Sequence, residues 1–230
     1  MQTRGFILIA LLMPAFGAGL TQVTARTIPL DEPGAMQPRN VKAERVTYKG
    51  RAALRVTEGA ANVPNGGRLV ILNKTDFQDG VIEIALTGEP GANAGEEARG
   101  FVGVAFRVSA GAANDGLKYE CFYLRPTNGR AGDQVRRNHS TQYMSFPEYP
   151  WQRLRQEFPE KYESYVDLMP GEWTMVKIEV RGDKARLYVN GAPQPVLVVN
   201  DLKHGQSRGP IALWIDTGTV AHFANLRVSP

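Results

Sequence analysis

Short runs of β-prone residues recur along this chain, and their number constrains the fold more than any other feature. The runs are separated by stretches rich in Gly, Pro, Asn and Asp, which favour turns. Eleven runs are present, at residues 41–48, 53–57, 68–73, 80–87, 101–108, 117–125, 173–181, 185–190, 195–199, 210–215 and 221–228. So many strands within 230 residues predict an all-β sandwich or barrel.

The clearest alternation lies in residues 173–190 and predicts a β-hairpin. Every second residue from Val176 to Val180 is apolar, and the same holds from Ala185 to Val189. Side chains of a strand point alternately to its two faces, so each run has one buried and one exposed face. Gly182 and Asp183 lie between the runs and supply the turn.

One long stretch, residues 140–171, breaks the strand pattern. It holds four prolines and many aromatic residues, and residues 151–158 (WQRLRQEF) predict two helical turns that end at Pro159. Long connections in compact domains are usually functional or disordered. Its aromatic content favours order, so we expect an ordered excursion from the sandwich.

The N-terminus has the layout of a secretory signal. Arg4 precedes an apolar run from Phe6 to Met13, and small residues follow. We expect a signal peptide at residues 1–25, an extended, proline-rich entry segment at 26–40, and one β-sandwich domain at 41–230. The alternative is an uncleaved anchor, but the apolar run is shorter than the ~20 residues that a membrane-spanning helix needs. The expected location is therefore periplasmic or secreted, with no stable membrane insertion after cleavage.

Cysteine content and charge limit the possible partners. Cys121 is the only cysteine, so no intramolecular disulfide forms, and the net charge is only +4. The arginines are interleaved with amides and aromatic residues, which favours a neutral or acidic carbohydrate over nucleic acid. The sequence has no Gly-rich phosphate loop, no Gly-x-Ser-x-Gly elbow and no pair of histidines at metal-ligand spacing, so no cofactor or metal is predicted.

Residues 119–143 are far more polar than a sheet requires, and we expect any site to lie here. In the preceding run, Val102, Val104, Phe106 and Val108 share the core face. The opposite face then carries only Gly103, Ala105 and Arg107, which predicts open space above the sheet with Arg107 rising from its floor.

The same alternation in residues 117–125 places Tyr123 and Arg125 on that open face. Glu120 then lies at the core margin, where it is either the ion-pair partner of an arginine or a catalytic acid. Cys121 is interpreted as a small buried residue and not as a nucleophile.

We read residues 133–139 as a further strand, in which an inward Val135 places Gln134, Arg136 and Asn138 on the open face. His139 is the best general acid or base by its intrinsic pKa, although a lone histidine is often structural. Tyr143 and Trp151 belong to the excursion and either roof the groove or fill a loop core. The expected substrate-binding residues are therefore Arg107, Tyr123, Arg125, Gln134, Arg136, Asn138, Tyr143 and Trp151, and the catalytic candidates are His139 and Glu120.

Four segments carry a resemblance to a known family: DFQDGVIEIAL (76–86), GFVGVAFRV (100–108), GEWTMVKIEVRGDKARLYVNG (171–191) and GPIALWIDTGTVAHFANLRV (209–228). They resemble concanavalin-A-like and laminin-G-like jelly rolls, among them the bacterial 3-keto-disaccharide hydrolase domains. The resemblance implies a two-sheet antiparallel jelly-roll sandwich whose concave face holds a carbohydrate. Arg107 and the pair Tyr119 and Glu120 lie where that family has its FR and YE strand motifs.

Three functions remain open from the sequence. The first is a carbohydrate-binding module, and the second is a glycoside hydrolase acting on 3-keto or acidic sugars. The third is a structural adhesion module, since the superfamily includes all three kinds of protein. The paired-acid strand motif of the related glucanases is absent, so retaining chemistry with two close carboxylates is not predicted.

Overall fold

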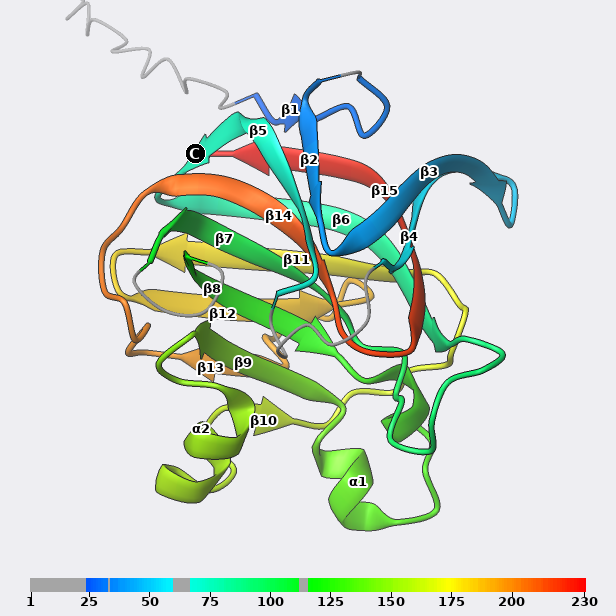
Figure 1. The fold of residues 1–230 in the computed structure, drawn as a ribbon. Helices are drawn as coiled ribbons and strands as arrows, with labels where there is room; N and C mark the ends of the chain where they lie inside the picture. Colours follow the sequence, from blue (N-terminus) through cyan, green and yellow to red (C-terminus); the bar gives the residue numbers. More distant parts are fainter. Residues whose placement is uncertain (1–23, 33, 60–66, 112–115) are drawn as a thin grey trace, which may run out of the picture.

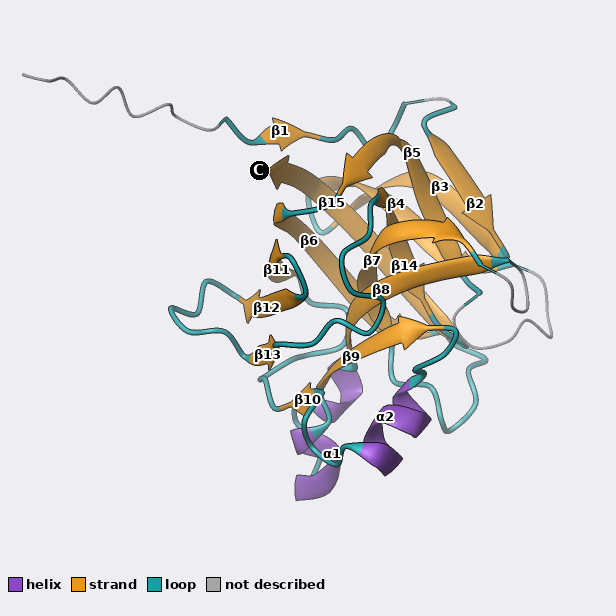
Figure 2. Ribbon diagram, turned by 90° about the vertical axis from the view of Figure 1, so that its left-hand side faces the viewer, coloured by secondary structure: helices purple, strands orange, loops and turns teal. Residues whose placement is uncertain are grey.

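The computed structural model describes residues 24–32, 34–59, 67–111 and 116–230. The predicted signal peptide, apart from its last two residues, lies outside this part of the chain. Within it, two antiparallel sheets face each other, as Figures 1 and 2 show. No helix in the described ranges is long and apolar enough to cross a membrane.

The first sheet runs in the order β13 (Leu197–Val199), β12 (Lys184–Val189), β11 (Thr174–Arg181), β6 (Gly80–Pro90), β15 (Thr219–Ser229), β4 (Arg51–Glu58) and β3 (Val41–Tyr48), with β1 (Arg26–Thr27) paired to β15. The second sheet runs in the order β10 (Glu163–Ser164), β9 (Thr141–Phe146), β8 (Leu117–Leu124), β7 (Val102–Ala110), β14 (Gly209–Ile215), β5 (Leu69–Phe77) and β2 (Met36–Arg39). The predicted two-sheet antiparallel sandwich is confirmed.

Each of the eleven predicted runs contains a strand of the structure. The predicted hairpin is β11 and β12, which pair from Val176 opposite Val189 to Arg181 opposite Lys184. Gly182 makes its turn with a φ of 60°, a conformation that glycine adopts without steric cost. The alternation of apolar residues therefore fixed both the strands and their register.

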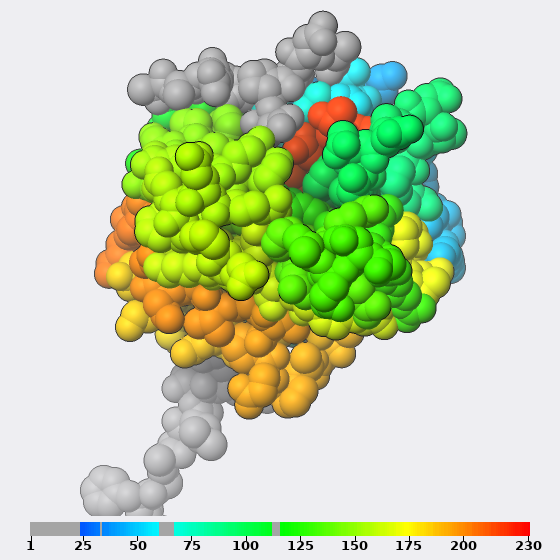
Figure 3. Space-filling view, turned by 90° about the horizontal axis from the view of Figure 1, so that it is seen from below, coloured from blue at the N-terminus to red at the C-terminus, as the bar shows by residue number. Residues whose placement is uncertain are grey.

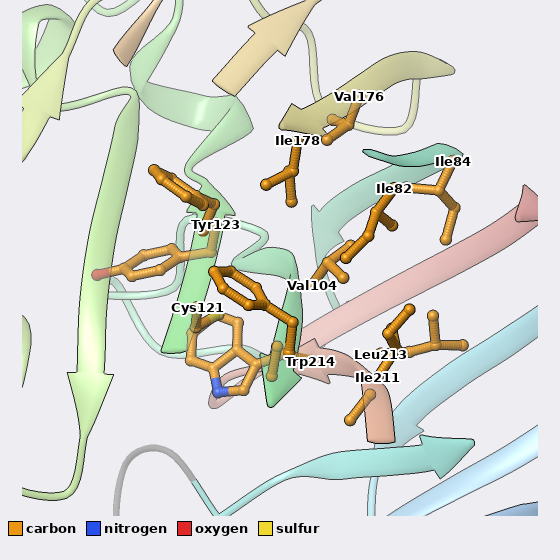
Figure 4. Close-up of a cluster of buried hydrophobic side chains, with 14 of the residues drawn as sticks. Ile82, Ile84, Val104, Cys121, Tyr123, Val176, Ile178, Ile211, Leu213 and Trp214 are labelled. Carbon is orange, nitrogen blue, oxygen red and sulfur yellow. The ribbon is translucent and has the colours of Figure 1, made fainter. Parts of the chain in front are cut away.

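The core lies between the sheets and is built from the predicted inward faces. Ile82 of β6 and Ile178 of β11 face Val104 of β7 and Leu213 of β14, as Figure 4 shows. All four side chains have no measurable exposure. Burying such a side chain contributes about 1.5–3 kcal/mol, so this layer is the main source of stability.

The opposite face of β7 is not open, which corrects the prediction. Gly103 pairs with Tyr123 on one side and Trp214 on the other, and the two rings approach to 4.7 Å between centroids. Ala105 is fully buried, and Tyr123 and Trp214 are 2% and 1% exposed. The small residues of β7 therefore make room for large rings from the neighbouring strands and not for a ligand.

The entry segment and the excursion contribute strands that the sequence pattern did not reveal. The entry segment supplies β1 and β2, one at each sheet, and the excursion supplies β9 and β10. The excursion also holds α2 (Trp151–Glu157), the helix predicted at this position. Between β8 and β9 lie the short 3-10 helix η1 (Pro126–Asn128) and α1 (Gln134–Asn138).

The strand predicted at residues 133–139 is wrong, because this segment is the helix α1. The Asp133 side chain caps it by accepting the backbone N–H of Arg136 at 2.7 Å. Val135, expected to point inward, is 63% exposed. One apolar residue among polar ones was too little to distinguish a strand from a capped helical turn.

Candidate functional site

A pocket of about 190 Å³ lies at the end of the second sheet where η1, α1 and α2 gather. Three segments form it: residues 97–101 before β7, residues 125–139 after β8, and α2. Figure 3 views this end of the molecule, where the three segments surround a recess. We call it the arginine pocket, and its lining consists of Glu97, Arg99, Phe101, Arg125, Asn128, Arg136, His139, Trp151 and Arg155.

Arg125 forms the innermost polar group of the pocket and is 4% exposed. Its Nη1 donates to the His139 carbonyl at 3.0 Å and to Glu163 Oε1 at 3.2 Å. Its Nη2 donates to the Tyr123 hydroxyl at 2.8 Å and to Gln142 Oε1 at 3.0 Å. Four hydrogen bonds hold the guanidinium rigidly, so its position does not depend on a ligand.

Glu163, in β10, is the buried counter-ion of the pocket. Its carboxylate accepts from Arg125 and accepts two hydrogen bonds from Arg155, one of 2.8 Å from Nε. Burial raises the pKa of Glu163, but the hydrogen bond from Arg155 and the charges of Arg125, Arg155 and His139 outweigh burial and lower the pKa overall. Glu163 is therefore ionised and engaged, and it is not a proton donor at neutral pH.

His139 ends α1 and presents its imidazole at the pocket wall, with 16% of the side chain exposed. Its Nε2 lies 3.6 Å from Glu163 Oε2. Burial lowers the pKa of His139 below 6.5, and the nearby Arg155 and Arg125 lower it further, although Glu163 opposes them. The imidazole is therefore neutral at pH 7 and able to accept a proton.

Trp151 begins α2 and positions two cations. The Arg155 guanidinium carbon lies 4.6 Å from the centre of the indole ring, and that of Arg125 lies 5.6 Å from it. Such contacts with the ring face are attractive by about 0.5–2 kcal/mol. Trp151 thus orders two arginines and forms part of the pocket wall.

Four of the predicted site residues line the arginine pocket: Arg125, Arg136, His139 and Trp151. Tyr123 supports it from below through Arg125. Gln134 and Asn138 do not line it. They lie exposed on α1 and form a 2.8 Å hydrogen bond with each other.

Arg107 is a structural residue, contrary to the prediction. The register shifts between Phe106 and Ser109, Arg107 adopts a φ of 55°, and the residue is 1% exposed. Its guanidinium donates to the carbonyls of Gln78, Gly182 and Gly205 at 2.8 Å each, and to Asp79 at 3.0 Å. A β-bulge turned this side chain away from the predicted face, and Arg107 instead ties three connections together.

Glu120 and Tyr143 also lie apart from the pocket and are fully buried. Glu120 accepts the Tyr143 hydroxyl at 2.6 Å and the backbone N–H of His204 at 2.8 Å. The Tyr143 oxygen in turn accepts the backbone N–H of Lys203 at 2.8 Å. The predicted arginine partner of Glu120 is replaced by these neutral donors, which fasten the loop before β14 to the second sheet.

The sequence analysis did not identify five residues of the pocket lining, nor Glu163 behind it. The five are Glu97, Arg99, Phe101, Asn128 and Arg155. Arg155 had a usable signal, because it lies four residues after Trp151 in a predicted helix and so shares its face. Arg99 belongs to the Gly-rich connection between β6 and β7, which has no strand pattern that would give its side chain a direction. Glu163 contacts Arg125 and His139, which precede it by 38 and 24 positions, and no sequence pattern indicates contacts over such separations.

A larger hollow, of about 390 Å³, lies between β1, the turn from β5 to β6 and the end of β15. None of the predicted site residues lines it, and its lining contains no histidine or tryptophan. Two residues of its lining form an ion pair, with Arg208 Nη1 at 3.3 Å from Asp76 Oδ2. The smaller arginine pocket is the better candidate because buried, hydrogen-bonded and titratable groups converge there.

The fold places the chain among the concanavalin-A-like jelly-roll β-sandwiches, a fold that it shares with a carbohydrate-binding module. A family model, the 3-keto-alpha-glucoside-1,2-lyase-like domain, matches residues 35–229. The chain therefore belongs to this family, as its strand motifs indicated.

Two solved structures support the fold at low sequence identity. A carbohydrate-binding module, CBM66, from Bacillus subtilis is 14% identical, with a TM-score of 0.55 over 85% of this chain and 96% of that one. A Bacillus subtilis protein of unknown function with a galectin-like fold is 11% identical, with a TM-score of 0.52 over 84% of this chain and 87% of that one. No curated protein sequence matches the chain.

Proposed function

We propose that this protein is an exported carbohydrate-binding β-sandwich whose ligand occupies the arginine pocket. The observation that carries the proposal is the convergence of four guanidinium groups and an imidazole in one pocket. Arginine donates two parallel hydrogen bonds to oxygen pairs of the kind that sugars present. Membership of a family named for its action on a glucoside supports a sugar ligand. The signal-like N-terminus supports export.

A second candidate function is lyase or hydrolase activity on a 3-keto sugar, and His139 favours it. A ketone at C3 acidifies the hydrogen at C2. A neutral imidazole takes that proton, the electron pair forms the C1–C2 double bond, and the oxygen at C1 leaves with a proton from solvent. Arginines stabilise the negative charge that develops on the C3 oxygen. His139 and Arg136 line the same pocket, so both roles lie within reach of one ligand.

Thermal-shift titration of the protein against neutral, acidic and 3-keto sugars, with product analysis of every hit, tests both functions. We expect Arg136→Gln to weaken binding about tenfold or more, a loss of about 1.4 kcal/mol. Arg130→Gln is the matched control, because Arg130 lies in the same segment but pairs with Asp167 outside the pocket. If the two variants bind alike, the pocket is not the site, and no shift with any sugar favours an adhesion module.

His139→Asn separates the binder from the enzyme. A binder keeps most of its affinity, because the asparagine still offers a hydrogen-bond acceptor. An enzyme that uses His139 as its base loses about 10²-fold or more in rate, with little change in sugar affinity. Turnover that survives in this variant would exclude His139 as the base, and absence of product in the wild type would leave binding as the function.

A further inference from the structure

The arginine pocket carries a surplus of positive charge before any ligand binds. Its lining holds four arginines and one carboxylate, Glu97, whose side chain is 98% exposed. Glu163, behind the wall, adds a second negative charge. Four positive and two negative charges give the pocket a net charge of about +2. His139 adds none at neutral pH, because its pKa is lowered.

Arg136 is the guanidinium in this group with the greatest freedom to bind. Its side chain makes no hydrogen bond or ion pair within the described part of the chain, whereas its backbone N–H donates to Asp133 and its carbonyl accepts the His139 N–H. Arg125, by contrast, is occupied at both terminal nitrogens, and Arg155 donates from Nε and Nη2 to Glu163. Arg99 donates to the carbonyls of Glu96 and Ala98 and to the Glu97 carboxylate, so an anion entering the pocket meets Arg136 and the remaining Nη1 of Arg155.

Asn128, a residue of the pocket lining, carries a buried acceptor without a partner among the described residues. Asn128 is 4% exposed, and its Nδ2 donates to the His139 carbonyl at 3.2 Å. Its Oδ1 is buried without a hydrogen-bond partner among the described residues. A buried acceptor without a donor costs about 1–3 kcal/mol, so a ligand hydroxyl that donates here recovers that energy.

These features call for one ligand with both an anionic group and hydroxyl donors. A plain anion satisfies the arginines but not Asn128, and a neutral sugar satisfies Asn128 but leaves the charge unbalanced. Resting on the proposed function, we infer that the arginine pocket binds a sugar unit bearing a carboxylate, a uronic acid. Its carboxylate pairs with Arg136 and Arg155, and one of its hydroxyls donates to Asn128 Oδ1.

Calorimetric titration of the protein with matched sugars tests the inference. The pair is a glucuronic-acid-terminated disaccharide and the same disaccharide ending in glucose, each at low and at high salt. We expect the uronate to bind about tenfold more tightly, or about 1.4 kcal/mol, at low salt. We expect this advantage to shrink at high salt, because exposed ion pairs are screened.

Two variants assign the contacts. Arg136→Gln is expected to weaken the uronate more than the glucose-terminated sugar and so remove the preference for the uronate, while Arg130→Gln keeps the preference. Asn128→Leu is expected to weaken both sugars to a similar extent, because the lost acceptor serves a hydroxyl that both carry. Circular dichroism of each variant shows whether it is folded before its affinity is compared.

The outcomes distinguish binding of a uronic acid from binding of carbohydrate in general. Equal affinity for both sugars overturns the uronic acid but leaves carbohydrate binding standing. Binding of inorganic phosphate or sulfate as tight as that of the uronate shows a plain anion site and overturns the sugar acid. If neither sugar binds, the uronic acid is overturned, and if the panel of neutral, acidic and 3-keto sugars gives no shift either, the proposed function is wrong as well.

Discussion

Arg155 of α2 donates two hydrogen bonds to the carboxylate of Glu163 in β10, and this pair closes one wall of the arginine pocket. The same carboxylate accepts a hydrogen bond from Arg125, which directly follows β8. One buried negative charge therefore holds two cations from separate segments, which would otherwise repel each other. The pocket exists in this form because the excursion brings Glu163 back to the edge of the second sheet.

Replacing Glu163 with glutamine is expected to destabilise the protein by about 3 kcal/mol, because two cations lose their counter-charge. The pKa of Glu163 is lowered in the folded protein, so its contribution is present above the unfolded pKa and is lost as the pH falls through the folded value. Urea denaturation near pH 7 and near pH 3 measures both effects. We expect the gap between wild type and variant to narrow in acid, and an unchanged midpoint at neutral pH would contradict the ion-pair account.

His222 is expected to make the fold acid-sensitive. It stacks on Tyr48 with 3.7 Å between ring centroids and contacts Thr87 Oγ1 through Nδ1 at 3.2 Å. Burial, with a smaller contribution from Arg55, lowers the pKa of His222 from 6.5 to about 4. The unfolded chain therefore binds the proton first, and stability falls as the pH drops from 6.5 towards 4, by about 3 kcal/mol in total.

His222→Phe keeps a ring against Tyr48 but cannot titrate. We expect the urea midpoint to fall between about pH 7 and about pH 4.5, and to fall further for the wild type than for the variant. An equal fall in both proteins would show that other groups cause the acid sensitivity.

The fold could be predicted from the sequence because its information is local and repeated. The alternation in β11 and β12 predicts which residues are buried, and Gly182 predicts the position of the turn. The short strands β1, β2, β9 and β10 were missed because their pairing is decided by distant partners and not by their own pattern. β9, for example, is buried on both faces, so no alternation distinguishes it.

The site was predicted in part, for reasons that individual residues show. The polar density of residues 119–143 predicted that Arg125, Arg136 and His139 lie together, and they line one pocket in the structure, although the strand predicted for residues 133–139 is wrong. Alternation failed for Arg107, where a bulge shifts the register, since a shift of one residue exchanges the two faces. Contacts such as those of Glu163 with Arg125 join distant segments, and a single sequence carries no local signal for them.

Arg107→Gln is expected to cost about 3 kcal/mol of stability without changing sugar affinity, since three carbonyls and a carboxylate lose a buried donor. Arg181→Gln, an exposed neighbour of the same turn, is the control and is expected to change stability little. Urea midpoints and calorimetric titration of both variants provide the comparison. Weaker sugar binding by a fully folded Arg107→Gln protein would place Arg107 in the site after all.

Gly103 tests whether the outer face of β7 is packed, as the structure shows, or open, as its sequence suggested. A Cβ at this position would lie 2.3 Å from the Phe122 carbonyl oxygen and 2.5 Å from the Tyr123 Cβ, closer than atoms approach. Gly103→Ala must therefore push β8 away or displace the rings of Tyr123 and Trp214, and we expect a loss of about 3 kcal/mol. Gly95→Ala is the matched control, since nothing lies within 4 Å of its added carbon.

Urea denaturation gives the stability of both variants, and the change in tryptophan fluorescence reports on Trp214, the one of the three tryptophans that pairs with Gly103. A red-shifted emission in Gly103→Ala alone would show that the ring has been exposed to water. A variant as stable as wild type, with unchanged emission, would mean that the face above Gly103 has room for a ligand. In that case the concave surface of the second sheet would return as a candidate for sugar binding, because Tyr123 and Trp214 would flank the open space.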